Sequence, residues 1–217
     1  MRKILLSFTI LLVTAVALGQ TLKPVQIDSL VTVSLPAGYQ KKDTLNQQIF
    51  SANGLLGYVV VIRAINDKNN APLKKERDLS KVLKEYVKGI QRQSAGGSAQ
   101  NVRDTTIGTL EAKNFTLKTD DGNGVQFRNF ILLYTQDATY TFEYVYPENR
   151  KDIIKDEFNA FASSIRLSPE LQRNDQYLSM AKGLSSINKL ILFGVVGVIV
   201  IVILIVIIRT RRKRRKS

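Results

Sequence analysis

The 217-residue sequence has no cysteine and no histidine. Without cysteine, the chain has no disulfide, no thiol nucleophile, no cysteine metal ligand and no cysteine for lipidation at its N-terminus. Without histidine, it lacks the commonest general base and the commonest ligand of transition metals. A phosphate-binding loop and a dinucleotide fingerprint are also missing. These absences predict a protein that is not an enzyme, with no catalytic, cofactor-binding or metal-binding residues and no cofactor.

Two chemical alternatives are weaker. Asp120, Asp121 and Asn123 are oxygen ligands of the kind that Ca²⁺ prefers, but no bidentate glutamate follows at the required spacing. Their Asp-Gly and Asn-Gly pairs are typical of a hairpin turn, which is the favoured interpretation. A serine nucleophile would need a lysine or a carboxylate as its base, and no known motif surrounds any serine. A hydrolase using carboxylates or a Ser-Lys pair is the competing hypothesis.

The net charge of +14 is high enough to suggest nucleic acid or an anionic surface as a partner. Its distribution argues against nucleic acid. Seven positive charges lie in the C-terminal tail and two at Arg2 and Lys3, which leaves +5 for residues 20–189. We therefore expect no nucleic-acid partner, and we attribute the high charge to membrane orientation.

Residues 190–208 form an uninterrupted apolar run of nineteen residues. As a helix with a rise of ~1.5 Å per residue, the run spans roughly 28 Å, close to the ~30 Å core of a bilayer. The sequence predicts a transmembrane helix here, followed by a basic cytoplasmic tail at 209–217. We expect anionic lipid headgroups to bind this tail at about 1 kcal/mol per basic residue. Its membrane-orienting residues are Arg209, Arg211, Arg212, Lys213, Arg214, Arg215 and Lys216.

The first nineteen residues have the pattern of a secretory signal peptide. Arg2 and Lys3 precede an apolar run at 4–18, and small residues at 17–19 place the cleavage before Gln20. An uncleaved signal anchor is the alternative. Both interpretations place the middle of the chain outside the cytoplasm, because the basic clusters at both ends belong on the cytoplasmic side. In a Gram-negative cell, this compartment is the periplasm.

Residues 20–168 have the size and pattern of one extracytoplasmic domain. Apolar segments with period two, or without interruption, predict strands, and apolar residues at helical spacing predict two helices. The strands are expected near 30–35, 47–52, 58–65, 101–106, 111–118, 125–134 and 138–146, and the helices near 78–91 and 147–165. This order predicts an α+β fold in which a mainly antiparallel sheet is sandwiched with two helices.

Two apolar faces of this domain have both a core and a binding interpretation. The first helix carries an apolar stripe of Leu79, Val82, Leu83, Tyr86, Val87 and Ile90. The strand at 138–146 presents Tyr140, Phe142, Tyr144 and Tyr146 on one face, and Thr139, Thr141 and Glu143 on the other. We expect the stripe to cover the sheet and the aromatic face to lie in the core. A partner-binding stripe and a tyrosine-lined pocket are the alternatives.

Residues 169–189 are expected to connect the domain to the membrane. Pro169 ends the domain, because proline continues neither a strand ladder nor a helix interior. Apolar residues then recur at helical spacing, namely Tyr177, Met180, Ala181, Leu184 and Ile187. This spacing predicts an amphipathic juxtamembrane segment at the membrane surface, or a first portion of the membrane helix. A face for self-association is the alternative.

Two short strings give the domain a resemblance to a known superfamily. Residues 33–39 read VSLPAGY and residues 161–167 read FASSIRL. Together with the helix at 78–91 and the paired long strands, they resemble the PsbP-like and Ran-binding Mog-type domains over residues 27–167. The resemblance implies a non-enzymatic fold used for docking or ligand binding, often in exported bacterial proteins. It carries over no catalytic motif.

The sequence thus predicts a single-pass, membrane-anchored protein whose domain binds or docks a protein, a lipid or an envelope component outside the cytoplasm. A membrane-tethered hydrolase without histidine or cysteine is one alternative. A structural subunit of a membrane complex, recognised through its membrane helix, is the other.

Overall fold

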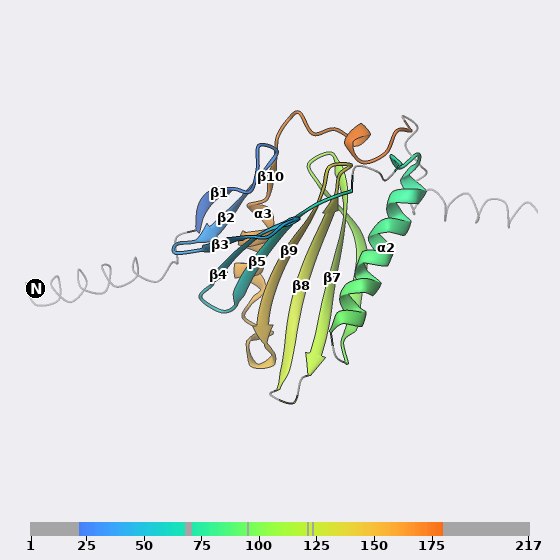
Figure 1. The fold of residues 1–217 in the computed structure, drawn as a ribbon. Coiled ribbons are helices and arrows are strands. Elements are labelled where there is room, and N and C mark those ends of the chain that lie inside the picture. The colour runs from blue at the N-terminus through green and yellow to red at the C-terminus, as the bar shows by residue number, and fades with distance from the viewer. Residues whose placement is uncertain (1–21, 68–70, 95, 121, 123, 180–217) are drawn as a thin grey trace, which may run out of the picture. The chain divides into compact units, whose positions relative to one another are not determined.

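The computed structural model describes residues 22–67, 71–94, 96–120, 122 and 124–179 (Figure 1). The expected signal peptide (1–19), membrane span (190–208) and basic tail (209–217) lie outside these residues, as does the juxtamembrane segment from Met180 onward. Within the described part of the chain, no helix combines the length and the apolar character needed to cross a membrane.

The described residues form two antiparallel sheets and two α-helices. The smaller sheet has the order β1-β2-β10, and the larger has the order β3-β4-β5-β9-β8-β7-β6. The strands are β1 (Leu22–Gln26), β2 (Val31–Pro36), β3 (Gln40–Asp43), β4 (Gln47–Asn53), β5 (Tyr58–Ile65), β6 (Ser98–Ile107), β7 (Leu110–Asp120), β8 (Val125–Tyr134), β9 (Ala138–Pro147) and β10 (Arg166–Leu167). The helices are α2 (Glu76–Gln93), α3 (Lys155–Ser163) and the 3₁₀ turns η1 (Glu148–Arg150) and η2 (Arg173–Asp175). The predicted α+β class is confirmed, with a second, three-stranded sheet that the sequence pattern did not indicate.

The larger core lies between the two sheets. Val31, Val33 and Leu35 of β2 alternate with half-buried residues, and all three are buried. They share one apolar cluster with the aromatic face of β9 and with Phe161 of α3. Tyr144 makes an edge contact with Phe158 and a tilted contact with Phe161, at centroid distances of 6.2 and 6.1 Å. The predicted core role of the β9 aromatic face is therefore confirmed.

Helix α2 covers the opposite face of the seven-stranded sheet (Figure 1). Leu79, Leu83 and Val87 are buried in a second cluster with β7 and β8, where Phe115 stacks on Phe130 at 4.6 Å. The other half of the predicted stripe is less deeply buried, although Ile90 packs against this cluster. Val82 and Ile90 are half-buried and Tyr86 is 37% exposed. The stripe thus covers the sheet as predicted, but with only one of its edges.

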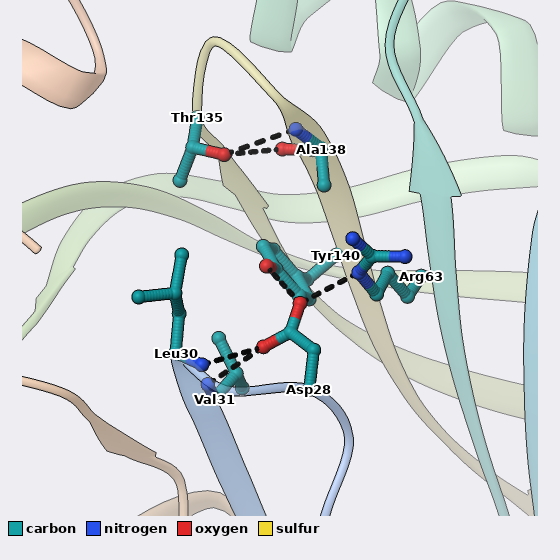
Figure 2. A network of polar contacts seen from close by, with 7 residues as sticks. All are labelled: Asp28, Leu30, Val31, Arg63, Thr135, Ala138 and Tyr140. Carbon is teal, nitrogen blue, oxygen red and sulfur yellow. Dashed lines mark hydrogen bonds and ion pairs between the residues drawn. The ribbon is translucent and has the colours of Figure 1, made fainter.

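Asp28 joins the small sheet to the large one (Figure 2). Its Oδ1 accepts the backbone N–H groups of Leu30 and Val31 at 2.9 Å, which closes the turn between β1 and β2. Its Oδ2 accepts Nε of Arg63 from β5 and the hydroxyl of Tyr140 from β9, both at 2.6 Å. Burial and this hydrogen bond raise the pKa of Tyr140 well above its ordinary value.

The folded domain continues past Ser168, where the sequence predicts its end, as far as Ser179. Gln176 and Tyr177 are fully buried, and the backbone N–H groups of Leu178 and Ser179 donate to the carbonyls of Leu73 and Lys74 at 2.9 and 3.0 Å. We call residues 168–179 the C-terminal strap. The prediction that Tyr177 belongs to a stripe on the membrane surface is wrong, because its ring packs in the α2 cluster.

The described members of both apolar clusters lie within residues 22–179, which belong to one compact unit. A domain with its own closed core can fold without the rest of its chain. A fragment of residues 20–179 is therefore the natural unit for solution experiments.

Candidate functional site

A groove of about 840 Å³ lies between α2 and the part of the seven-stranded sheet that the helix leaves open. Strands are spaced by roughly 4.8 Å and a helix is roughly 10 Å wide, so one helix covers two or three strands. Helix α2 packs on β6, β7 and β8. Residues on the same face of β9, β5 and β4 line the groove beside it. The groove volume is within the range of ordinary ligand sites.

The middle of the groove is apolar. Helix α2 contributes one wall through Val82, Tyr86 and Ile90, which follow each other at intervals of four residues and so share one face. Ile62 and Ala64 of β5 lie on one side of the floor and Phe130 of β8 on the other, with β9 between them. Cross-strand pairing places Ile62 directly opposite Thr141 of β9. Thr141 is thus the polar residue among these apolar ones, while Thr139 and Glu143 of the same strand lie toward the two ends.

An ion pair closes one end of the groove. Glu143, with only 5% of its side chain exposed, accepts a short hydrogen bond at Oε1 from Nε of Arg128. Glu143 lies opposite Phe130, and Arg128 lies opposite Val145, so the pair is diagonal across β8 and β9. The Arg128 Nη1 group also donates to Oγ of Ser94, at the end of α2, at 3.4 Å. Both charged groups are thus fixed in position at the floor.

A hydrogen-bond chain closes the other end. Thr139 donates from Oγ1 to Oδ1 of Asn66 at 2.9 Å, and Asn66 donates to the carbonyl of Thr135 at 2.8 Å. The Tyr86 hydroxyl lies 3.2 Å from the same Thr139 oxygen. Since the single hydroxyl proton of Thr139 is already used, Tyr86 is the donor in this contact. These hydrogen bonds hold the Tyr86 side chain in place as part of the wall that α2 forms.

The lining of the groove carries no net charge, although the whole chain has a charge of +14. Two of its charged groups are cationic, Lys81 and Arg128, and two are anionic, Glu85 and Glu143. Glu85 is exposed on the rim and accepts a hydrogen bond from Lys88 at 2.8 Å; this bond and the lysine charge lower the pKa of Glu85. A buried carboxylate costs several kcal/mol unless it is paired, which explains the close contact between Glu143 and Arg128.

The acidic turn considered as a calcium site behaves as a turn where the structure describes it. Asp120 accepts the backbone N–H of Gly122 at 3.0 Å through its own side chain, the contact that a tight turn requires. Asp121 and Asn123 lie outside the described residues. In the described ranges, no group of three or more acidic side chains is arranged to hold a metal ion. The seven membrane-orienting residues of the tail also lie outside those ranges.

The sequence indicated the polar face of β9 but not its place in a groove. Thr139, Thr141 and Glu143 alternate with the buried aromatic residues, and this alternation was visible. The sequence indicated less clearly that Arg128 lies on this face. The turn at Thr135 fixes the register of β8 and β9. There the Thr135 hydroxyl donates to the carbonyl of Ala138 and accepts the backbone N–H of Ala138 (Figure 2). Counting back from that turn would have placed Arg128 on the same face as Glu143.

Comparisons with known proteins place this architecture in a class. No protein-family model and no curated protein matches the sequence. Among solved structures, the chain is similar to cyanobacterial PsbP (CyanoP) from Synechocystis sp. PCC 6803, with 18% identity over 70% of this chain and 96% of that one and a TM-score of 0.52. A protein from Bacteroides thetaiotaomicron is also similar, with 10% identity over 70% of this chain and 50% of that one and a TM-score of 0.43. LpqN, involved in cell envelope biogenesis of Mycobacterium tuberculosis, has 11% identity over 69% of this chain and 91% of that one and a TM-score of 0.42.

The described domain is thus an antiparallel α+β module with a helix on each side of its main sheet. More specifically, its fold is PsbP-like, as the sequence resemblance implied. At 18% identity the similarity establishes the fold alone. The activity has to be argued from the groove.

Proposed function

We propose that this chain is a single-pass, membrane-anchored protein whose PsbP-like domain binds a ligand in the α2 groove outside the cytoplasm. One observation carries the proposal: the groove of about 840 Å³ has an apolar middle and polar groups fixed at both ends. Concave apolar sites with a few fixed polar groups are typical of ligand binding. The PsbP-like fold is compatible with such a module.

The contacts in the groove favour binding over catalysis. Ser94 is the serine of the groove lining, and its hydroxyl donates to the carbonyl of Ile90 at 3.0 Å. A nucleophilic serine has to deliver this proton to a base instead. Glu143, the buried carboxylate of the lining, accepts its hydrogen bond from Arg128, and in the described structure the Ser94 hydroxyl donates to a backbone carbonyl and not to Glu143. We therefore retain the non-enzymatic function and treat the hydrolase as the alternative.

The membrane placement rests on the sequence. The apolar run at 190–208 has the length of a bilayer span, and the basic residues on its C-terminal side, like Arg2 and Lys3, favour the cytoplasmic side. In this arrangement, anionic lipid headgroups contact the tail from Arg209 to Lys216. A reporter enzyme that is active only outside the cytoplasm tests it. Fused after Ser179, in place of the predicted span, the reporter should be active, and fused after Ser217 it should be inactive. Activity of the Ser217 fusion would contradict the topology.

A substitution at Gly89 tests the groove. Gly89 lines the groove from α2, and an added Cβ there meets no atom within 4 Å. The Cβ of Gly89→Phe therefore has room, its ring should occupy the groove, and the change replaces a poor helix former. Lys84→Phe puts the same ring on the exposed face of the same helix and is the matched control.

The probe for this test is N-phenyl-1-naphthylamine, an uncharged dye whose fluorescence rises in apolar surroundings. The fragment of residues 20–179 and its Lys84→Phe variant should bind the dye, and Gly89→Phe should bind it at least tenfold more weakly while unfolding at an equal or higher temperature. Equal binding by all three proteins would place the dye elsewhere and would contradict the proposed site.

A further inference from the structure

Each member of the ion pair at the floor of the groove has one terminal group without a hydrogen bond to a described residue. In the described structure, the hydrogen bonds of Arg128 and Glu143 engage Nε, Nη1 and Oε1, and the guanidinium also lies over the Phe130 ring, 5.2 Å from its centroid. The Nη2 group of Arg128 and Oε2 of Glu143 remain for another molecule. A guanidinium nitrogen only donates and a carboxylate oxygen only accepts. A hydroxyl group, which does both, can satisfy the two together.

The groove next to this pair adds further groups that donate and accept. Thr141 lies two residues before Glu143 on the same face of β9, and Gln93 lies on α2 near Ser94. A threonine hydroxyl and a glutamine amide can each donate and accept. The polar end is thus suited to a head group with several hydroxyls, and not to one with a single full charge.

Charge complementarity points the same way. Glu143 would repel an anionic head group at the place where Arg128 would attract it, and the reverse holds for a cationic head group. On the rim, Lys81 and Glu85 have the same compensating relation. A charged ligand would lose its hydration, and its attraction to one member of the ion pair would be cancelled by repulsion from the other. An uncharged ligand would lose less hydration free energy.

The apolar middle defines the remainder of the ligand. Val82 and Ile90 of α2 face Ile62 and Ala64 of β5 across the groove, and each of the four is half-buried. Partly exposed apolar residues on two facing elements gain free energy when an apolar chain covers them, at about 25 cal/mol per Å². The groove therefore has one apolar subsite and one uncharged polar subsite.

We propose that the groove binds an uncharged amphiphile, with its apolar chain between α2 and β5 and its hydroxyl-bearing head group on Arg128 and Glu143. This inference rests on the proposed function of the groove as the ligand site. It assigns Arg128 and Glu143 the role of specificity-determining residues that reject charged head groups.

Three amphiphiles with the same chain and different head groups test this assignment: octyl glucoside, octyl sulfate and octyltrimethylammonium. Each is titrated below its micelle concentration against the fragment of residues 20–179 loaded with N-phenyl-1-naphthylamine, and the displacement of the dye is measured. The wild-type fragment should bind octyl glucoside about tenfold or more tightly than either charged compound.

Glu143→Gln supplies a readout that mere structural damage does not produce. The variant leaves the Arg128 charge unpaired, so octyl sulfate should gain about tenfold in affinity and overtake octyl glucoside. Glu148→Gln makes the same change on an exposed residue of η1, outside the groove, and should keep the wild-type order. Should Glu143→Gln not fold, Arg128→Gln provides the mirror test, in which octyltrimethylammonium gains instead.

The outcomes separate the two proposals. Failure of the dye to bind, or binding that Gly89→Phe does not weaken, overturns the proposed site itself. Dye binding in the groove with equal displacement by all three amphiphiles, or with an order that Glu143→Gln leaves unchanged, overturns the head-group assignment alone.

Discussion

Gln176 pairs with the backbone of Glu111 as a neighbouring strand would. Its Oε1 accepts the Glu111 N–H at 2.8 Å and its Nε2 donates to the Glu111 carbonyl at 2.7 Å. The same Nε2 also donates to the carbonyl of Tyr134 at 2.9 Å. A single side chain thus satisfies three backbone groups of β7 and β8 and fixes the C-terminal strap to the start of the sheet.

The loss of this side chain should be costly. Gln176→Ala removes a hydrogen bond from one part-buried N–H and from two part-buried carbonyls, and each such loss costs about 1 to 3 kcal/mol when water does not replace the bond. We expect the free energy of unfolding of the fragment of residues 20–179 to fall by about 3 kcal/mol in urea titrations. Gln126→Ala, at an exposed position of β8, should change it by less than about 0.5 kcal/mol. Similar values for the two variants would show that the strap is loosely attached.

The boundary of the domain gives a second prediction. A fragment that ends at Ser168 lacks Leu171, Gln176 and Tyr177, all of which are buried in the longer chain. It also lacks the backbone pairing of the strap with Leu73 and Lys74, just before α2. We expect the fragment of residues 20–168 to unfold at least 10 °C below the fragment of residues 20–179 in thermal scans, since several kcal/mol are lost. Equal midpoints would restore Ser168 as the end of the domain.

Two glycines should respond to alanine in opposite ways. At Gly57, in the turn between β4 and β5, a Cβ would lie 2.2 Å from the ring of Tyr144 and 2.5 Å from the carbonyl of Val145. Gly57→Ala should therefore destabilise the fold by about 2 kcal/mol or more. At Gly89 the space is open and the backbone is helical, so Gly89→Ala should stabilise by about 0.5 to 1 kcal/mol. Urea unfolding measures both, and a loss of stability at Gly89 would contradict the open groove.

Stability should decline at alkaline pH because of Tyr140. Burial and the hydrogen bond to Asp28 raise its pKa above the ordinary value of 10.0, so the folded protein keeps the proton where the unfolded chain loses it. The contribution of the Tyr140 proton to the free energy of unfolding is complete below pH 10 and is lost as the pH rises beyond that value. Urea titrations at pH 8, 9, 10 and 11 should show this decline, with a smaller slope above pH 10 for Tyr140→Phe. Identical slopes would show that the Tyr140 proton is not linked to folding.

The parts of the fold that the sequence predicted are those whose residues repeat with a clear period. Leu79, Leu83 and Val87 indicated α2, and the alternation of Tyr140 with Thr141 indicated both faces of β9. Strand β3 has four exposed residues and no apolar alternation, so its position depends on pairing with β4. Strand β10 has two residues and exists through its pairing with β2. Neither strand leaves a periodic signal.

The C-terminal strap and the groove could not be predicted from the sequence for a different physical reason. Tyr177 follows Pro169 in a polar stretch, and its burial depends on the hydrogen bonds of Gln176 to strands far away in the chain. The α2 stripe predicts that the helix covers a sheet, but not how many strands the sheet has. The groove exists because seven strands are wider than one helix, and that width is a property of the assembled sheet.

The site of ligand binding is the central claim, and amide chemical shifts test it most directly. In a titration of the ¹⁵N-labelled fragment of residues 20–179 with N-phenyl-1-naphthylamine, the largest shifts should come from Ile62, Val82, Ile90 and Thr141, on both sides of the groove. Residues of β1, β2 and α3, on the opposite face of the sheet, should hardly move. The largest shifts at β2 or α3 would place the ligand elsewhere and would contradict the proposed function of the groove.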